Sequence, residues 1–274
     1  MSGALPAVWV LDLDGTLLGP DHQMAPEAVA ALAAAHAQGV HVVIATGRIL
    51  AATLPALAAL PFRPWLVCCG GQTVLAPDDT EARVTRTLDP AHVADALARA
   101  LPEPDVAIQL YTATTQAMWR PNAAGRFLGT SEGIDFTPLD VLPEAPDDLV
   151  KIVFTAEPEV ALALDARFAG ELPYSYTPTG RRYRDVLPRG VDKGVALRRL
   201  LARTGWPADR VLAAGDNAND LPLFAEARWR VAVVGRCPPL VALATHTVTD
   251  SASLGRILAS LLPGPVPRPG GTGG

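Results

Sequence analysis

The chain contains few cysteines and no long hydrophobic run. Three cysteines occur among 274 residues, which is too few for a disulfide framework, and none has the spacing of zinc ligands. No stretch approaches roughly 18 consecutive apolar residues free of proline, glycine or charge, so we predict no membrane span. The first residues also lack the basic region of a secretory signal. These absences favour a cytoplasmic protein.

Basic charge is also scarce. The 23 lysines and arginines are outnumbered by 28 aspartates and glutamates, giving a net charge of −5, and no long basic run occurs. This balance excludes a typical nonspecific nucleic-acid binder, so we expect neither nucleic acid nor a membrane as a partner. The hydrophobic fraction of 49% and charged fraction of 19% are those of a globular protein. Only the tail, residues 264–274, has the glycine and proline content of a disordered segment.

Short apolar runs alternate with helical segments near the start of the chain. Residues 8–11, 40–45 and 65–69 have the composition of buried parallel strands. Pro26 begins a helix between the first two, and Gly39 ends it. This alternation predicts an α/β fold with a doubly wound, Rossmann-like parallel sheet.

The character of the sequence changes near residue 80 and changes back near residue 186. The intervening residues mix alternating strands with helices, and we interpret them as an inserted α+β cap domain large enough for its own core. The strand and helix pattern of the first segment then resumes. The predicted organisation is a core domain in two segments, 1–79 and 186–263, the cap at 80–185, and the tail at 264–274.

The first motif with chemical potential follows the first strand. Asp12 and Asp14 lie two residues apart in Asp-Leu-Asp-Gly-Thr, so both carboxylates can point into one crevice. An acidic turn with glycine is common in proteins, but the full five-residue pattern is rare by chance.

A second acidic motif follows the predicted strand at 211–214. Gly-Asp-Asn-Ala-Asn-Asp carries Asp216, Asn219 and Asp220. Alone it is equally compatible with a polar loop. Beside the first motif, its carboxylates favour a magnesium site, because Mg²⁺ prefers an octahedron of oxygen ligands.

Two further segments are suited to binding an anion. Lys193 follows Asp192 in the first turn of a predicted helix, where the helix N-terminus and the ammonium attract negative charge. Thr46, Gly47 and Arg48 follow the second strand and offer a hydroxyl and backbone N–H groups. The alternative interpretations, without any role in binding, are a surface lysine at residue 193 and a simple strand-to-helix turn at residues 46–48.

These segments share one position in the predicted fold. Asp12, Thr46 and Asp216 each follow the carboxyl end of a parallel strand, the edge of an open α/β sheet where ligands bind. Carboxylates alone repel a phosphate, but Mg²⁺ and Lys193 neutralise them. The arrangement therefore predicts phosphoryl chemistry.

Taken together, the chain resembles the haloacid dehalogenase superfamily, specifically its Cof-type phosphatases with a large cap between the second and third motifs. The resemblance covers nearly the whole chain apart from its tails. It rests on four segments in the family's order: Asp-Leu-Asp-Gly-Thr-Leu-Leu at 12–18, Ala-Thr-Gly-Arg at 45–48, Gly-Val-Asp-Lys-Gly at 190–194, and Gly-Asp-Asn-Ala-Asn-Asp at 215–220.

The resemblance implies a role for each motif residue. Asp12 is the expected nucleophile that forms an aspartyl-phosphate, and Asp14 the expected general acid and base. Mg²⁺ is expected on the Asp12 carboxylate, the Asp14 backbone carbonyl and Asp216. The remaining expectations are phosphate binding by Thr46, Gly47, Lys193 and Asn219, and supporting roles for Asp220 and Arg48.

The chain departs from the family pattern at a few positions. Gly70-Gly71-Gln72 stands where Asn-Gly-Ala is common, and Gly235-Arg236 replaces a commoner Asn-Ala. Neither change removes a catalytic group, so we expect them to affect the substrate pocket instead.

Three functions remain open from the sequence. The first is a magnesium-dependent phosphomonoesterase acting on a small phosphorylated metabolite, with a sugar phosphate the class that the resemblance implies. The second is a phosphotransferase or phosphomutase sharing the aspartyl-phosphate. The third is a non-catalytic phosphometabolite-binding module, which the presence of both Asp12 and Asp14 disfavours. Arg181, Arg182 and Arg184 form either a solvated strand edge or a contact to an anionic part of the substrate.

Overall fold

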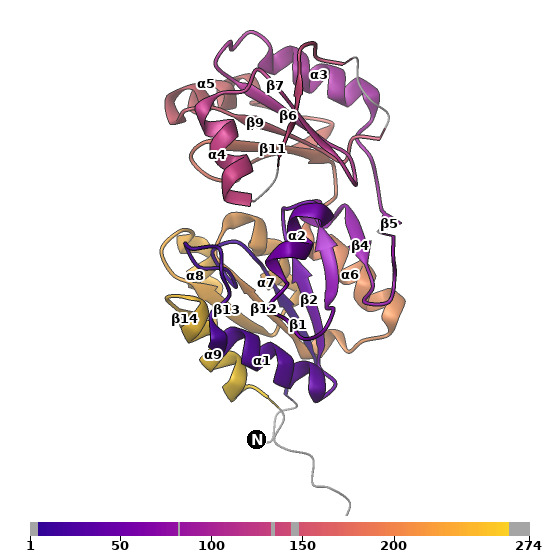
Figure 1. Ribbon diagram of the computed structural model, residues 1–274, viewed down its shortest axis with the longest axis vertical. Coiled ribbons are helices and arrows are strands. Elements are labelled where there is room, and N and C mark those ends of the chain that lie inside the picture. The colour runs from indigo at the N-terminus through magenta and orange to yellow at the C-terminus, as the bar shows by residue number, and fades with distance from the viewer. Residues whose placement is uncertain (1–4, 82, 133–134, 144–147, 263–274) are drawn as a thin grey trace, which may run out of the picture.

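The chain folds into two β-sheets, each covered by helices, that lie one above the other in Figure 1. The computed structural model describes residues 5–262 except 82, 133–134 and 144–147. The predicted disordered tail at 264–274 lies outside the described residues. Within the described part of the chain, no helix has both the length and the apolar character needed to cross a membrane.

Within the described residues, eight strands form the first sheet. Neighbours from β14 to β3 are parallel, and β4 and β5 extend the sheet antiparallel. Their order is β14 (His246–Val248), β13 (Trp229–Val233), β12 (Val211–Gly215), β1 (Val8–Leu11), β2 (His41–Ala45), β3 (Trp65–Cys68), β4 (Thr73–Leu75) and β5 (Arg83–Val84).

The central strand β1 is buried on both faces. Trp9 and Leu11 pack into one hydrophobic cluster, and Val8 and Val10 pack into another on the opposite face. Helices cover both clusters, because a parallel strand with apolar residues on both sides needs two covered faces. One face is covered by α1 (Pro26–Ala37) and α9 (Ser251–Ser260), and the other by α6 (Lys193–Thr204), α7 (Leu221–Glu226) and α8 (Pro238–Leu243).

The strand order reverses between β1 and β12. The chain proceeds from β1 to β2 and β3 in one direction and from β12 to β13 and β14 in the other. At such a reversal the loops after the two strands diverge to opposite faces of the sheet and leave a crevice at its carboxyl edge. The predicted doubly wound core is confirmed, and its crevice lies where the two acidic motifs begin.

The second sheet, with its helices, forms the part that we call the cap. It has six strands among the described residues and is mainly antiparallel. Their order is β10 (Tyr174–Pro178), β11 (Tyr183–Pro188), β9 (Lys151–Thr155), β6 (Ala107–Tyr111), β7 (Gln116–Trp119) and β8 (Thr137–Leu139). The cap helices are α3 (Pro90–Ala100), α4 (Ala123–Glu132) and α5 (Pro158–Arg167). The short helix α2 (Leu50–Ala56) lies with the first sheet and not with the cap.

The two faces of the cap sheet have different environments. Ile108 and Leu110 pack with α3 and α5 in the cap's own hydrophobic cluster. Tyr111 and Val153 belong instead to the cluster of the first sheet, so this face of the cap is turned toward the core. Alternate side chains of the cap strands therefore face either the cap's own cluster or the core.

The limits of the sheets differ from the predicted domain boundaries at residues 80 and 186. β5 pairs with β4 in the first sheet and begins four residues beyond residue 79, the expected end of the first segment. β11 continues to Pro188 within the cap sheet. The difference arises because Gly70 and Gly71, with φ of 65° and 114°, reverse the chain after β3 and start an antiparallel extension.

The close packing of α1 against α9 depends on Gly255. A Cβ atom at this position would lie 2.4 Å from both the backbone N of Ala28 and the backbone carbon of Glu27. We expect Gly255→Ala to lower the free energy of unfolding by about 1–3 kcal/mol, since the two helix backbones must separate. Urea unfolding measures the change.

Gly47→Ala is the matched control, because nothing lies within 4 Å of a Cβ built at Gly47. We expect this second variant to unfold at the urea concentration of the wild type. Equal stability of the two variants would contradict the packing argument.

Candidate active site

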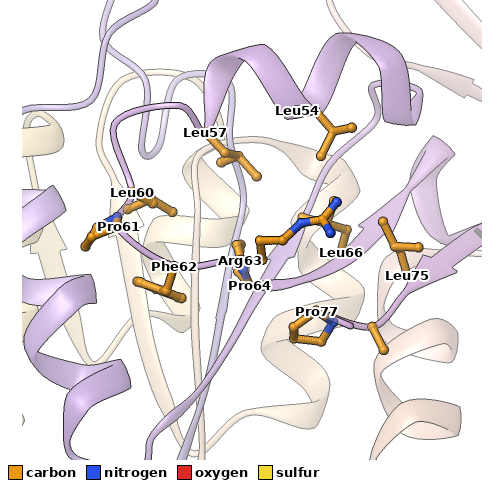
Figure 2. Close-up of a pocket in the computed structure, with 11 residues that line it drawn as sticks. Leu54, Leu57, Leu60, Pro61, Phe62, Arg63, Pro64, Leu66, Leu75 and Pro77 are labelled. Carbon is orange, nitrogen blue, oxygen red and sulfur yellow. The ribbon is translucent and has the colours of Figure 1, made fainter. Parts of the chain in front are cut away.

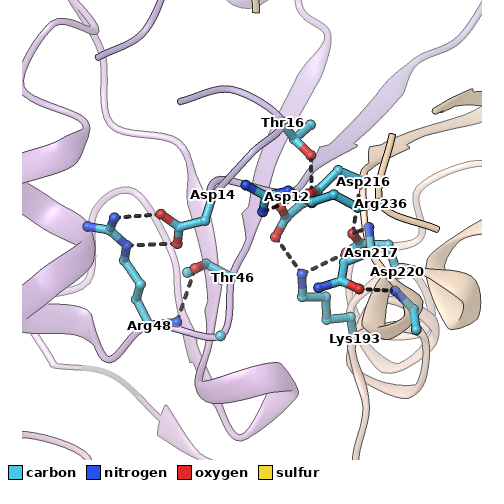
Figure 3. Close-up of polar contacts among 12 residues, drawn as sticks. Asp12, Asp14, Thr16, Thr46, Arg48, Lys193, Asp216, Asn217, Asp220 and Arg236 are labelled. Carbon is cyan, nitrogen blue, oxygen red and sulfur yellow. Dashed lines mark hydrogen bonds and ion pairs between the residues drawn. The ribbon is translucent and has the colours of Figure 1, made fainter. Parts of the chain in front are cut away.

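A buried lysine joins the two acidic motifs. The Asp192 carboxylate accepts from the backbone N–H of Val195 at 2.7 Å and so starts α6 at Lys193. The Lys193 side chain is 1% exposed, and its Nζ donates to Asp12 Oδ1 at 2.5 Å and to Asp220 Oδ1 at 2.7 Å (Figure 3). Although burial alone lowers the pKa of Lys193, the two carboxylates raise it, so the ammonium stays charged.

Asp12 lies directly after β1, at the point where the strand order reverses. Its backbone N–H donates to the Ala214 carbonyl at 3.0 Å, which sets it beside the start of the second motif. Burial raises the pKa of Asp12 well above its usual value, and the nearby Asp220 carboxylate raises it further, against the opposing effect of Lys193. The attraction of Lys193 therefore does not fully offset the cost of burying the Asp12 carboxylate.

Asp220 orders the loop that carries Asp216. One of its oxygens accepts from Lys193, and the other accepts from the backbone N–H groups of Asp216 at 3.1 Å and Asn217 at 3.2 Å. Burial, followed by repulsion from Asp220, raises the pKa of Asp216 to about 6. Asp216 Oδ2 is buried and accepts no hydrogen bond among the described residues, although Arg236 Nη1 lies 3.2 Å away as an ion pair.

Gly15 permits the two motifs to approach each other. Its φ is +81°, and a Cβ atom there would lie 2.5 Å from Asp216 Oδ2. A side chain at this position would combine backbone strain with a clash against the carboxylate. The glycine of the first motif thus allows Asp216 to lie against the loop that contains Asp12 and Asp14.

Asp14 points away from Lys193 and is held by Arg48 (Figure 3). The guanidinium donates Nε to Asp14 Oδ2 at 2.8 Å and Nη2 to Asp14 Oδ1 at 2.5 Å. Such two-point pairing fixes the plane of a carboxylate. The Arg48 backbone N–H in turn donates to Thr46 Oγ1 at 3.1 Å, so the turn after β2 positions the arginine that orients Asp14.

A cavity of about 670 Å³ lies between the core and the cap and contains these groups on one wall. Its size is that of a site for a small molecule. The core wall includes Asp12, Asp14, Gly47, Arg48, Asp216 and Asn219, and the cap wall includes Phe127, Leu128, Lys151, Val153, Thr179, Tyr183 and Asp185.

A second cavity of about 340 Å³ lies beneath α2 and has a different character (Figure 2). Arg63 is the single charged side chain among the 11 residues that line it, and the others are leucines, prolines, Phe62 and Ala76. This cavity has no carboxylate, hydroxyl or amide side chain that could carry out phosphoryl chemistry.

The residues of the larger cavity fit a bound Mg²⁺. Ligand atoms of Asp12, Asp216 and Asp220 lie within 4.8 Å of one another. The buried Asp216 Oδ2 and Asn219 Oδ1 atoms each lack a hydrogen bond among the described residues. The donors are all oxygen, which suits magnesium. The described cavity lining has five carboxylates and three cations: Asp12, Asp14, Asp185, Asp216 and Asp250, and Arg48, Lys151 and Arg236. A phosphate dianion therefore needs additional positive charge there.

The structure brings all four sequence motifs together, but some of their residues line the cavity and others lie behind its wall. Asp12, Asp14, Gly47, Arg48, Asp216 and Asn219 line the cavity, whereas Thr46, Lys193 and Asp220 lie fully buried behind them. The individual roles of these residues stay predictions.

Sequence reasoning missed several cavity residues, chiefly Lys151, Tyr183 and Asp185, whereas Arg236, expected to affect the substrate pocket, does line the cavity. Lys151 begins a predicted cap strand, but nothing local in the sequence signals that it faces the core. Of the arginine cluster at residues 181–184, Arg184 is instead paired with Asp165, with its Nε 2.5 Å from Asp165 Oδ1.

Comparisons with known proteins point to one family and one fold. A model of the haloacid dehalogenase-like hydrolase family matches residues 9–257. Pyridoxal phosphate phosphatase YbhA of Escherichia coli strain K12 is 27% identical over 267 residues, covering 90% of this chain and 94% of that protein. The crystal structure of TM0651 from Thermotoga maritima has a TM-score of 0.78 at 23% identity, covering 94% and 97%. The sugar phosphatase BT4131, of HAD subclass IIB, has a TM-score of 0.79 at 16% identity, covering 93% and 99%.

Removal of the central cation should destabilise the core strongly. Lys193→Met leaves Asp12 and Asp220 buried without their counter-ion, and we expect a loss of about 3–5 kcal/mol in the free energy of unfolding. Arg198→Met on the same helix is the control, because the Arg198–Glu226 pair is largely exposed at Arg198 and contributes little. Chemical denaturation of both variants at neutral pH, with metal chelated, measures the difference.

Replacement of the anion Asp12, in place of the cation Lys193, should not destabilise the metal-free protein. Because burial and Asp220 raise the pKa of Asp12, its ionised form is costly at neutral pH, and Asp12→Asn removes that cost. We expect a thermal midpoint equal to or above that of the wild type with metal chelated. A clear decrease would show that the Asp12–Lys193 attraction exceeds the burial cost.

Proposed function

Because the chain belongs to the haloacid dehalogenase-like hydrolases, as its four motifs predicted, we propose that it is a magnesium-dependent phosphatase of small phosphorylated metabolites. The proposal is carried by one observation. The buried Asp12 carboxylate, bound to Lys193, lies on the same cavity wall as the Arg48-oriented Asp14 carboxylate, and the cap covers that cavity.

In the first step an Asp12 carboxylate oxygen bonds to phosphorus while the bond from phosphorus to the ester oxygen breaks. Asp14 gives its proton to the departing oxygen, so an alcohol leaves and an aspartyl-phosphate remains. In the second step a water oxygen bonds to phosphorus and Asp14 takes the water's proton. The bond between Asp12 and phosphorus then breaks, which releases inorganic phosphate and restores both carboxyl groups.

Other residues of the chain position the phosphoryl group. An ammonium has three N–H donors, and Lys193 gives one each to Asp12 and Asp220, which leaves one for a phosphoryl oxygen. The Gly47 amide and Asn219 side chain, both on the cavity wall, and the adjacent Thr46 hydroxyl are the further donors that we propose. The bidentate pair with Arg48 fixes the Asp14 carboxylate on the cavity wall. To act as the acid of the first step, Asp14 takes up a proton and releases one of these two hydrogen bonds.

Mg²⁺ would be held by the Asp12 carboxylate, the Asp14 backbone carbonyl and Asp216. When bound, it supplies the positive charge that offsets the carboxylates and the phosphoryl oxygens. Asp220 has its oxygens occupied by Lys193 and by two backbone N–H groups, which supports a loop-ordering role rather than direct coordination.

The substrate class follows from the size of the cavity and from the relatives. A relative named as a pyridoxal phosphate phosphatase and a structural neighbour described as a sugar phosphatase both act on small phosphate esters. The cavity volume of about 670 Å³ suits such molecules. Within this class we propose a sugar phosphate.

The nucleophile assignment is tested by Asp12→Asn. We expect phosphate release from para-nitrophenyl phosphate and from a panel of sugar phosphates to fall by at least about 10³-fold, because an amide cannot form the aspartyl-phosphate. Release is measured with Mg²⁺ and with chelator. Asp209→Asn, at an exposed position, is the control and should keep wild-type activity.

A wild-type rate in Asp12→Asn would contradict the assignment. The formation of an isomeric phosphate ester without inorganic phosphate would favour a phosphomutase instead.

The metal assignment has a test that does not depend on turnover. Binding of Mg²⁺ to the folded state stabilises the protein by about 2.7 kcal/mol at a concentration of 100 Kd. We therefore expect MgCl₂ to raise the thermal midpoint of the wild type. In Asp216→Asn the increase should be lost, because an amide oxygen is a weaker ligand than the carboxylate. An equal increase in both proteins would exclude Asp216 as a ligand.

A further inference from the structure

A buried ion pair of the cap lies on the cavity wall opposite the catalytic carboxylates. Lys151 at the start of β9 and Asp185 in β11 lie on one face of the cap sheet, because Asp185 pairs with Val153 and side chains two residues apart share a face. Lys151 Nζ is 2.9 Å from Asp185 Oδ2, and the side chains are 10% and 11% exposed. Both residues line the cavity.

The pair is held from three sides. Lys151 Nζ lies 3.4 Å from the Gly47 carbonyl of the core and 5.5 Å from the centre of the Tyr111 ring. Asp185 Oδ1 accepts from Thr179 Oγ1 at 3.1 Å. The two charges therefore have fixed positions beside the turn that we propose binds the phosphoryl group.

Fold stability alone does not account for this pair. Its neighbours on the same face of the sheet, Tyr111 and Val153, pack into the hydrophobic cluster shared with the core. Removal of two charges from water costs free energy that their attraction seldom repays in full, and apolar replacements of such pairs often leave stability unchanged or higher. A role in binding gives the pair a reason to be present.

The chemistry of the pair matches a neutral molecule with hydroxyl groups. A hydroxyl both donates and accepts, so one hydroxyl can donate to Asp185 while its neighbour accepts from Lys151. The pair has no net charge, and the described cap wall has no other charged side chain. Because Lys151 is already paired with Asp185, an anionic leaving group would meet the Asp185 carboxylate with no second cation on the described cap wall to offset the repulsion. Val153, Tyr183 and Phe127 provide apolar contact for the carbon atoms of the ligand.

We propose that Lys151 and Asp185 select the leaving group, favouring phosphate esters of neutral polyhydroxy alcohols over esters with an anionic leaving group. This inference rests on the proposed phosphatase function and adds the two cap residues that select among its substrates.

The test compares selectivity in the double variant Lys151→Met/Asp185→Leu. The quantity measured is the ratio of kcat/KM for ribose 5-phosphate or glucose 6-phosphate to kcat/KM for para-nitrophenyl phosphate, whose leaving group bears no additional hydroxyl. We expect this ratio to fall by about tenfold or more, because the hydroxyl groups lose their partners. A thermal midpoint near that of the wild type excludes unfolding as the cause.

Arg182→Met is the matched control, because it removes a cation from the residue just before β11, at an exposed pair with Glu157. Its selectivity ratio should equal that of the wild type. A ratio unchanged in the double variant would overturn the inference.

A single variant keeps the test decisive should the double variant fail to fold. Asp185→Asn preserves volume and removes the negative charge, so phosphoglycolate, with its carboxylate, should gain in kcat/KM relative to the sugar phosphates. No gain, or wild-type protein that prefers phosphoglycolate to every sugar phosphate, would contradict the assignment. Absence of phosphate release from every ester by wild-type protein with Mg²⁺ would instead overturn the phosphatase function, and the inference with it.

Discussion

The ammonium of Lys193 is the interaction on which the site depends. Asp12 follows β1 and Asp220 belongs to the loop after β12, and one buried cation bonds to both. Without this cation, three carboxylates would lie close together in a region shielded from water. The lysine lowers that repulsion, but the three carboxylates are paired with only two cations among the described residues, Lys193 and the exposed Arg236, so the site retains an excess of negative charge. This excess favours binding of a further cation.

The fold creates this arrangement through the position where its strand order reverses. β1 and β12 are neighbours in the sheet, although about 200 residues separate them in sequence. The residues between them supply the turn after β2, with Arg48 and Gly47, and the whole cap. Segments distant in sequence thus bring the proposed nucleophile, the proposed acid and the cap to one edge of one sheet. The cap contributes its own polar pair, Lys151 and Asp185, to the opposite wall.

The core strands and the motif residues could be predicted because their signals are local. The apolar run at 8–11, the acids after it and the Asp192 cap are each visible within a few residues, and all occupy the expected places. Lys151 and Asp185 could not be identified in this way, because their meeting depends on the register between β9 and β11 and on which face is turned toward the core. The β4–β5 extension was not predicted because β5 is two residues long and its composition does not indicate a strand.

The central claim, that Asp12 becomes phosphorylated and Asp14 then activates water, is tested most directly by a burst experiment. Para-nitrophenyl phosphate has a leaving group that departs without protonation, so Asp14→Asn should still complete the first step but stall before the second. The account predicts a rapid burst of about one nitrophenolate per enzyme molecule in Asp14→Asn, followed by very slow turnover. It also predicts no burst when Asp12→Asn is added. Steady turnover without a burst, or a burst that persists without the Asp12 carboxylate, would contradict it.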